Sequence, residues 1–266
     1  MLLRAFMPAA AMAAVLATPV IAQVPDTVAT AEILEGWRGA DGRHMTALQI
    51  TLAPGWKTYW RSPGAAGIPP SFDWSRSENA ARVALSYPLP NVFEVAGMRS
   101  IGYADQVVFP VAVTPNDTGA PITLAADLLI GVCEEVCVPL EMSVSGTLPA
   151  DSTDRALDIR IAMANRPMSA DEAGVSDVSC EADFMEDGLR LVTRMHLPQL
   201  GADEVAVVEY SDPTIWVTEP KVMRNGDYIE MHSDLIAFGE QHFAFFRDET
   251  RITVFGGGQA VDIRGC

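Results

Sequence analysis

Cys133 and Cys137 are the two residues whose type and spacing are best suited to chemistry. Three residues separate them: Glu134, Glu135 and Val136. An apolar run precedes the pair at 124–130, and a run that alternates loosely between apolar and polar residues follows at 138–144. Two strand-like runs joined by so short a segment indicate a hairpin or a tight loop. That geometry brings the two sulfurs close enough to form a disulfide bond.

The other two cysteines of the chain, Cys180 and Cys266, suggest which bridge is structural. Closing a loop of about 87 residues restricts the unfolded chain by roughly 4.6 kcal/mol, against roughly 2 kcal/mol for a loop of about five. The long pairing is therefore the natural structural disulfide, and it follows here by elimination. Strained or exposed bridges are the ones that exchange. The short spacing thus favours a redox pair over a purely structural disulfide or a metal site.

Metal chemistry is the least favoured use of the two neighbouring sulfurs. A zinc site needs further Cys or His ligands, and none lies near Cys133 and Cys137 in the sequence. Cu(I) suits soft thiolates, so copper handling stays open, although the 12 methionines are dispersed and Met142 is the one close by. The sequence also has no G-x-S-x-G motif and no phosphate-binding glycine loop. We therefore predict neither a metal nor a cofactor.

Residues 1–22 have the features of a secretory signal peptide. A weakly basic start precedes a small apolar segment, and residues 20–22 fit the rule for cleavage before Gln23. No later segment reaches the ~18 apolar residues that a membrane-spanning helix needs. An exported chain can form disulfides, and four cysteines are an even number. The net charge of −17 argues against nucleic acid and anionic lipid as partners.

The remaining chain divides into two β-rich parts. Residues 30–149 contain many short strand-like runs, frequent turns and no convincing long helix, which is typical of a β-sandwich. Within residues 150–176 we predict one helix, Asp154–Ala164, with N-cap candidates at 151–154, and then a polar linker. One stripe of that helix is apolar, so we expect it to dock between the domains. Residues 177–266 predict a second, smaller β-sandwich.

Individual segments carry more specific expectations. In the first part, Pro110 lies in a strong strand candidate and indicates an edge strand or a bulge. Residues 90–100 predict an irregular loop. The strands predicted in the first part lie at 45–52, 56–61, 83–88 and 106–113. Those predicted in the second part lie at 189–195, 205–210, 215–217, 228–231, 243–246 and 252–255, with hairpin turns at 186–188 and 225–226.

Four stretches of the first part carry a specific resemblance: Gly55–Gly64 (GWKTYWRSPG), Pro69–Trp74 (PPSFDW), Gly102-Tyr103 through Phe109–Val111, and Val132–Pro139 with its two cysteines. Their order and spacing resemble the N-terminal periplasmic domain of the DsbD thiol:disulfide interchange family, in its ScsB-like or stand-alone variant. The second part resembles the additional β-sandwich of ScsB-like chains. The resemblance implies an immunoglobulin-like domain and a periplasmic thiol:disulfide oxidoreductase of the protein-disulfide reductase type.

The resemblance also implies partners. A membrane-embedded thiol electron carrier, CcdA-like or DsbD-like, delivers reducing equivalents. The dithiol passes them to oxidised periplasmic proteins such as disulfide isomerases or copper-resistance thioredoxin-like proteins. In the family the second cysteine forms the mixed disulfide with the partner, which maps to Cys137, and Cys133 then resolves it. The familiar enterobacterial domain has a longer spacer between its cysteines than the three residues here.

Supporting residues follow from the same resemblance. The family shields its cysteine pair with a cap loop that bears an aromatic residue, and the matching stretch here is Phe93–Met98. The aromatic residues expected under the pair are Trp56, Tyr59 and Tyr103. From the residues themselves, we expect Glu134 and Glu135 to tune the thiols, because nearby negative charge disfavours a thiolate. Two other functions stay open: a binding or adaptor module with a structural disulfide, and a Cu(I)-handling protein.

Overall fold

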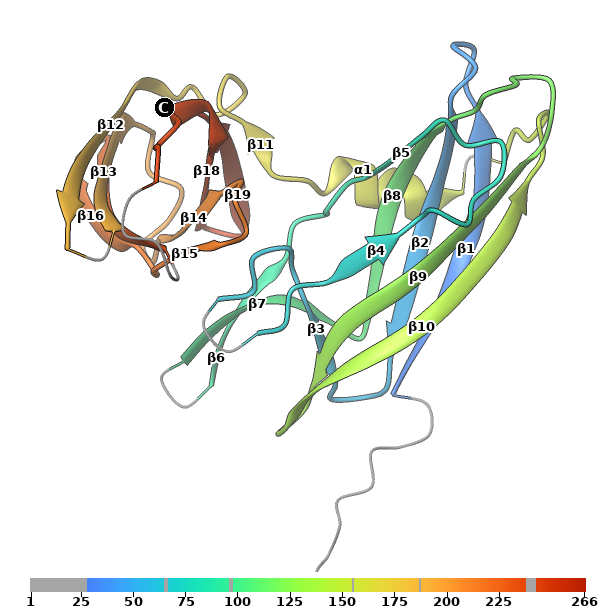
Figure 1. Ribbon diagram of the computed structural model, residues 1–266, viewed down its shortest axis with the longest axis horizontal. Coiled ribbons are helices and arrows are strands. Elements are labelled where there is room, and N and C mark those ends of the chain that lie inside the picture. Colours follow the sequence, from blue (N-terminus) through green and yellow to red (C-terminus); the bar gives the residue numbers. More distant parts are fainter. Residues whose placement is uncertain (1–27, 65–66, 96–97, 155, 187, 238–242) are drawn as a thin grey trace, which may run out of the picture.

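Nearly all of the regular structure is β. The computed structural model describes residues 28–64, 67–95, 98–154, 156–186, 188–237 and 243–266, so the signal peptide predicted at 1–22 lies outside the described residues. The strands form four sheets, and these make two sandwiches that lie side by side (Figure 1). We call them the N-terminal and the C-terminal sandwich.

The N-terminal sandwich is immunoglobulin-like and built from two antiparallel sheets. One sheet has the order β1–β2–β8–β5, with β1 (Ala29–Arg38), β2 (His44–Leu52), β8 (Gln106–Thr114) and β5 (Arg82–Leu85). The other has the order β10–β9–β3–β7–β6, with β4 also pairing with β9; its strands are β10 (Cys137–Leu148), β9 (Ile122–Cys133), β3 (Lys57–Tyr59), β7 (Met98–Ala104), β6 (Asn91–Val95) and β4 (Ser71–Asp73).

The core of this sandwich forms where alternate residues of the two sheets face each other. Phe109 of β8 is 1% exposed and lies at the centre of an aromatic cluster. Its ring meets three others edge to face, at centroid distances of 5.4–5.7 Å: Phe72, Tyr87 and Tyr103. These contacts hold β4 and β7 of one sheet against β8 of the other, and so fix the sheet that carries the two neighbouring cysteines.

The C-terminal sandwich has its own core. Its first sheet has the order β11–β19–β18–β14, with β11 (Met168–Ser169), β19 (Gln259–Arg264), β18 (Thr250–Gly256) and β14 (Val205–Tyr210); β11 and β19 are parallel. Its second sheet has the order β12–β13–β17–β15, with β16 also pairing with β17; its strands are β12 (Ser176–Met185), β13 (Gly188–His196), β17 (Tyr228–Ala237), β15 (Ile215–Val217) and β16 (Lys221–Asn225). A short 3₁₀-helix, Arg247–Glu249, precedes β18.

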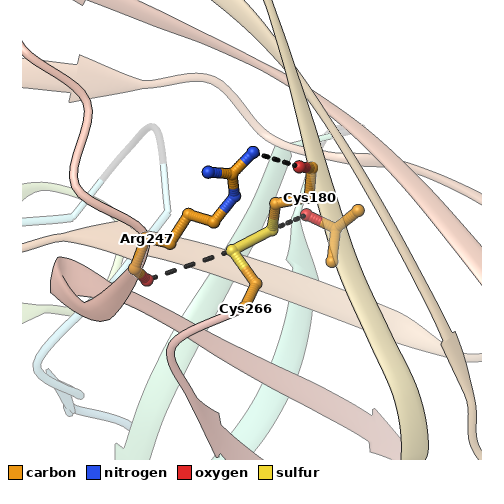
Figure 2. The surroundings of a disulfide bond; sticks show 4 residues. Cys180, Arg247 and Cys266 are labelled. Atoms are coloured by element: carbon orange, nitrogen blue, oxygen red, sulfur yellow. Dashed lines mark hydrogen bonds between the residues drawn. A yellow bond between two sulfur atoms is a disulfide. The ribbon is translucent and has the colours of Figure 1, made fainter.

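A disulfide joins Cys180 of β12 to Cys266 after β19, with 5.6 Å between the Cα atoms. Figure 2 shows Arg247 beside it, donating from its guanidinium to the carbonyl oxygen of Cys180 at 3.2 Å. The hydroxyl of Thr193 lies 3.4 Å from the sulfur of Cys180. Cys180 is 5% exposed. The bond therefore ties the end of the chain to a buried strand.

Residues directly after β3 join the two sandwiches. Trp60 is fully buried, and its ring meets Phe255 of the C-terminal sandwich edge to face at 5.3 Å. The guanidinium of Arg61 stacks on the ring of Trp60 at 3.7 Å. It reaches three polar groups of the C-terminal sandwich: Glu209 (3.0 Å), the hydroxyl of Thr253 (2.9 Å) and Asp262 (3.6 Å). Arg99 of β7 also pairs with Glu219 of the C-terminal sandwich.

The helix α1 (Leu157–Ala164) begins three residues later than predicted, and none of residues 151–154 caps it. Its N-cap is Ala156, which has no capping side chain. Ser152 is buried instead, and its hydroxyl donates to the carbonyl oxygen of Gly36 at 2.6 Å. The segment before the helix is therefore held against β1. The helix buries Ile159 against β8. It borders a groove of about 860 Å³ whose far side is the β18–β19 turn.

Three other expectations for local structure are wrong. Residues 90–100 were expected to be irregular, but Asn91–Val95 and Met98–Ala104 form the antiparallel pair β6–β7. Pro110 lies in an inner strand, between β2 and β5; it is tolerated because β5 ends opposite Val111, and Ser86 still donates to the Pro110 carbonyl at 2.8 Å. Residues 243–246 are not a strand. Among the described residues, no helix is long and apolar enough to cross a membrane.

Candidate redox site

Cys133 and Cys137 form a disulfide beside the turn that joins β9 to β10. This turn is the tip of the β9–β10 hairpin in Figure 1. The two cysteines are the last register pair of the hairpin, and their Cα atoms are 4.1 Å apart. Both are half-buried, whereas the three residues between them are exposed, Val136 by 69%. A partner protein can thus approach the bond from the tip while the strands hold its two ends.

Tyr59 contacts the disulfide directly. Its hydroxyl oxygen lies 2.9 Å from the sulfur of Cys137. A disulfide sulfur carries no hydrogen, so the phenol is the donor. Tyr59 is 5% exposed, and this burial raises the pKa of its hydroxyl above the ordinary value of 10.0. The phenol therefore keeps its proton throughout the pH range in which thiols ionise, and it can donate to a thiolate on Cys137 as well as to the closed bond.

Space for Tyr59 comes from a glycine in the neighbouring strand. A Cβ atom on Gly131 would lie 2.7 Å from Cβ of Ile68 and 2.7 Å from Cδ2 of Tyr59. A Cβ on Gly67 would come within 2.9 Å of the same ring. The tyrosine ring thus lies in a slot between β9 and the loop that follows β3. The two glycines let it approach close enough to reach the sulfur of Cys137.

Lys57 is a residue of the site that the sequence interpretation missed. In the sheet it pairs with Cys133 on one side and with Ala104 on the other. Its ammonium group lies 4.8 Å from the centroid of the Phe93 ring, which is a cation–π contact. The available signal was the alternation in β3, because Lys57 and Tyr59 are two residues apart and so lie on one face.

The other residues expected to support the cysteine pair do not all lie on the face of the sheet that carries the disulfide. Trp56 and Tyr103 are buried in the sandwich core, on the opposite face of the sheet from the disulfide. The hydroxyl of Tyr103 donates to the carbonyl oxygen of Pro88 at 2.8 Å. Phe93 is half-buried in β6, in the stretch that was expected to form a cap over the cysteine pair. Met98 begins β7, and its side chain lies outside the described parts of the structure.

Glu134 and Glu135 are exposed at the tip of the hairpin. A Cβ atom on Gly55 would lie 3.0 Å from Oε1 of Glu134, so that carboxylate turns back over the turn before β3. In the part of the chain that the structure describes, no group of three or more His, Cys, Asp and Glu side chains could hold a metal ion. The chemistry that this geometry directly offers is that of the two sulfurs.

Comparisons with known proteins agree with this geometry. Residues 27–149 match the family model of the thiol:disulfide interchange protein DsbD, N-terminal. The crystal structure of the N-terminal periplasmic domain of ScsB from Proteus mirabilis aligns over 91% of this chain and 94% of its own, at 24% identity and with a TM-score of 0.66. That alignment shows a shared fold that extends over both sandwiches.

Two further comparisons found no related protein. A structure named BspA_C_WT aligns over 88% of this chain and 97% of its own at 7% identity, and its TM-score of 0.18 is too low to indicate a common fold. No curated protein matches the sequence. The match over residues 27–149 contains both neighbouring cysteines and the strands that hold them. The match covers the N-terminal sandwich, so residues 27–149 are a domain of the DsbD N-terminal type, a family named for thiol:disulfide interchange.

Proposed function

We propose that this chain is a periplasmic thiol:disulfide oxidoreductase that passes reducing equivalents through the Cys133–Cys137 dithiol. The observation that carries the proposal is the disulfide at an exposed hairpin tip, with the hydroxyl of Tyr59 on the sulfur of Cys137. An accessible sulfur and a neighbouring thiol are the two requirements of exchange. Family membership supports the same chemistry.

In the proposed reaction the reduced chain donates two electrons to a partner's disulfide. The thiolate of Cys137 attacks one partner sulfur, and the other partner sulfur leaves as a thiolate. The thiolate of Cys133 then attacks the sulfur of Cys137 and releases the second partner sulfur. The partner is left as a dithiol, and the Cys133–Cys137 bond is closed again. Cys133 faces Cys137 directly across the hairpin, so the resolving step needs no change of register.

The proposed partners follow from the family. A membrane-embedded electron carrier with its own dithiol would reopen the Cys133–Cys137 bond. The electrons would then pass to oxidised periplasmic proteins, either thioredoxin-like proteins or disulfide isomerases. Cleavage of residues 1–22 during export would place the mature chain in the periplasm, where disulfides can persist.

Trapping the mixed disulfide tests this function. Cys133→Ala leaves Cys137 without its resolving thiol, so partners should accumulate as disulfide-linked adducts that reductant dissolves. Cys137→Ala should capture far fewer, because Cys133 lacks the hydrogen bond from Tyr59. A Cys180→Ala/Cys266→Ala variant is the matched control and should exchange normally if it folds.

The same experiment separates exchange from a structural disulfide. If neither single variant captures a partner, and the Cys133–Cys137 bond stays oxidised in cells and against strong reductant, the function proposed here is wrong. That combination of results would instead support the binding or adaptor module that the sequence left open.

A further inference from the structure

A pocket of about 620 Å³ lies where the two sandwiches meet the segment that connects them. Its walls come from three parts of the chain: residues 85–87 at the end of β5, residues 166–171 around β11, and the strands β18 and β19. Figure 1 shows the chain running from α1 to β11 across this junction. Neither cysteine of the candidate redox site lines the pocket, so the function proposed above does not account for it.

Four arginine side chains line this pocket: Arg61, Arg166, Arg251 and Arg264. The chain as a whole is acidic, with 18 Lys and Arg residues against 35 Asp and Glu residues. The fold therefore gathers at this junction positive groups that are scattered in the sequence. A guanidinium group recognises carboxylate and phosphate oxygens through paired N–H donors. The pocket thus suits an acidic ligand wherever these donors are not already used.

The carboxylates around the pocket occupy the arginines unequally. Arg166 pairs with both oxygens of Glu172, at 2.6 and 2.8 Å. Arg251 pairs with both oxygens of Asp262, at 2.6 and 2.7 Å. The side chain of Arg264 is 76% exposed, and its ion-pair contact, at 4.0 Å, is to the Asp262 oxygen that already accepts from Arg251. Among the described residues, Arg264 therefore has no carboxylate of its own.

Two further residues in the wall have donors that the protein does not use. The side chain of Arg61 is 11% exposed. Its Nε and Nη2 atoms donate to Glu209 and Thr253, whereas Nη1 donates to no group in the part of the chain that the structure describes. The hydroxyl of Tyr87 makes no hydrogen bond there either. Burial raises the pKa of Tyr87 to about 12, so at neutral pH this hydroxyl keeps a proton that it can donate.

The electrostatic surroundings of Arg61 favour a further negative charge. Burial and the positive charge of Arg251 lower the pKa of Arg61, even though Glu209 and Asp262 act in the opposite direction. An anion beside this guanidinium would offset the repulsion between the two arginines. The group that opposes an anion is Asp171, an exposed carboxylate that lines the pocket and makes no ion pair among the described residues.

We propose that this pocket binds a small polyvalent oxyanion, either a phosphate or a compound with two or three carboxylates. Arg264 and the Nη1 atom of Arg61 supply the charged donors, and the hydroxyl of Tyr87 supplies a neutral one. These donors belong to both sandwiches, so the ligand stabilises the arrangement in which the sandwiches pack together. The site is separate from the cysteine pair, and its ligand takes no part in the exchange reaction.

Thermal unfolding of the oxidised protein tests for this ligand. At pH 7 and constant ionic strength, millimolar citrate or inorganic phosphate should raise the melting temperature by about 3 °C and then saturate. Stabilisation by exclusion of these salts from the protein surface would rise steadily instead. Isothermal titration calorimetry gives the affinity for each probe. Binding of citrate alone would assign the site to polycarboxylates, and binding of phosphate would assign it to phosphate-type anions.

Three substitutions in the wall and one outside it test the assigned donors. Arg264→Gln should weaken binding by about tenfold, because a hydrogen bond between charged groups is lost. Tyr87→Phe should weaken it by about threefold without changing any charge. Asp171→Asn should strengthen it by about threefold, since a like charge is removed. The matched control is Arg190→Gln, which removes an exposed arginine paired with Asp234 on the other sheet of the C-terminal sandwich and should leave the affinity unchanged.

Arg264 and Arg190 are both exposed, so their variants should fold, and melting temperatures without ligand check this. If the wild-type protein binds neither probe in a saturable way, the anion site does not exist. Equal losses of affinity in Arg264→Gln and Arg190→Gln would also overturn it, because they would show an effect of overall charge alone. Neither result bears on the exchange function, which the trapping experiment with Cys133→Ala tests separately.

Discussion

The hydroxyl of Tyr59 lies 2.9 Å from the sulfur of Cys137, and no equivalent contact to the sulfur of Cys133 occurs among the described residues. The two sulfurs of one bond therefore differ in environment. Cys137 has a hydrogen-bond donor fixed in a slot of the fold, whereas Cys133 has the strand partner Lys57. This asymmetry gives each cysteine a distinct set of expected responses to mutation.

Tyr59→Phe should weaken Cys137 as a nucleophile. A hydrogen bond to a charged group contributes about 1.5–3 kcal/mol, so losing this donor should raise the pKa of the Cys137 thiol and slow its alkylation at pH 7 by tenfold or more. The measurement is the pH dependence of alkylation in a Cys133→Ala background. Because burial raises the pKa of Tyr59, the profile of Cys133→Ala with Tyr59 intact should show no second transition below pH 10.

Tyr103→Phe is the matched control for that experiment. Tyr103 is also buried, but its hydroxyl donates to the carbonyl oxygen of Pro88, away from the disulfide. Its loss leaves a buried acceptor unsatisfied and should cost about 1–3 kcal/mol of folding free energy. The alkylation rate of Cys137 should not change. Equal slowing in both variants would show that Tyr59 acts through the general stability of the sandwich.

Gly131→Ala should impair the site through sterics alone. The new methyl group would lie 2.7 Å from both Ile68 and the Tyr59 ring, so the ring must move away from Cys137. We expect slower alkylation of Cys137, close to the rate of Tyr59→Phe. Gly146→Ala crowds Ile33 at the other end of the same hairpin and should reduce stability without that kinetic effect. Retention of the wild-type rate in Gly131→Ala would argue against the slot.

The two disulfides should open in a fixed order. Cys180 is 5% exposed, whereas the Cys133–Cys137 bond lies beside an exposed tip, so titration with dithiothreitol should reduce the short bridge first. Loop entropy predicts a loss of roughly 4.6 kcal/mol when both Cys180 and Cys266 become Ala, and roughly 2 kcal/mol for the Cys133/Cys137 double variant. Urea unfolding measures both. A larger loss from the short bridge would contradict the assignment of roles.

The contact between the sandwiches should weaken in acid. Burial raises the pKa of Asp262, but the hydrogen bonds from Arg251 and the positive charges of Arg251 and Arg61 outweigh burial and hold it below the ordinary value of 3.8. A carboxyl group with a lowered pKa stabilises the fold above its unfolded pKa, and this contribution is lost as the pH falls through its folded pKa. We expect the interface to persist at pH 5 and to loosen below about pH 3.8.

Small-angle scattering across that pH range, compared with Asp262→Asn, checks this expectation. The variant should show the loosened scattering profile already at pH 5, since its side chain cannot ionise. Identical profiles for the two proteins at every pH would mean that the carboxylate of Asp262 does not hold the interface.

Local signals explain which features the sequence predicted. The Cys133–Cys137 hairpin depends on strands adjacent in the chain, and the turns at 186–188 and 225–226 carry their own residue preferences. The start of α1 could not be predicted from the sequence. The hydroxyl of Ser152 donates to the carbonyl oxygen of Gly36 in β1 instead of capping the helix, and only the tertiary fold brings these two residues together. The β6–β7 pair was missed for a similar reason, since β6 is short and β7 is fixed by its pairing with β3.

At the candidate site, too, some residues could be predicted from the sequence and others could not. The cysteines and Tyr59 could be named from spacing and resemblance. Lys57 could not, because its importance comes from register with Cys133 and from a ring two strands away. Trp56 and Tyr103 lie under the sheet rather than beside the sulfurs, and only the register of β3 with β7 separates the two faces.

Five consecutive residues, Lys57 to Arg61, run from the edge of the disulfide into the neighbouring sandwich. A fragment cut at the family boundary, residue 149, would strip Phe255 from the indole of Trp60 and the acidic groups from Arg61. The cut would expose to solvent an aromatic surface that is buried in the intact protein. Dissecting this protein by family match alone would thus yield an aggregation-prone fragment, and the second sandwich is best regarded as part of the folded unit that contains the first one.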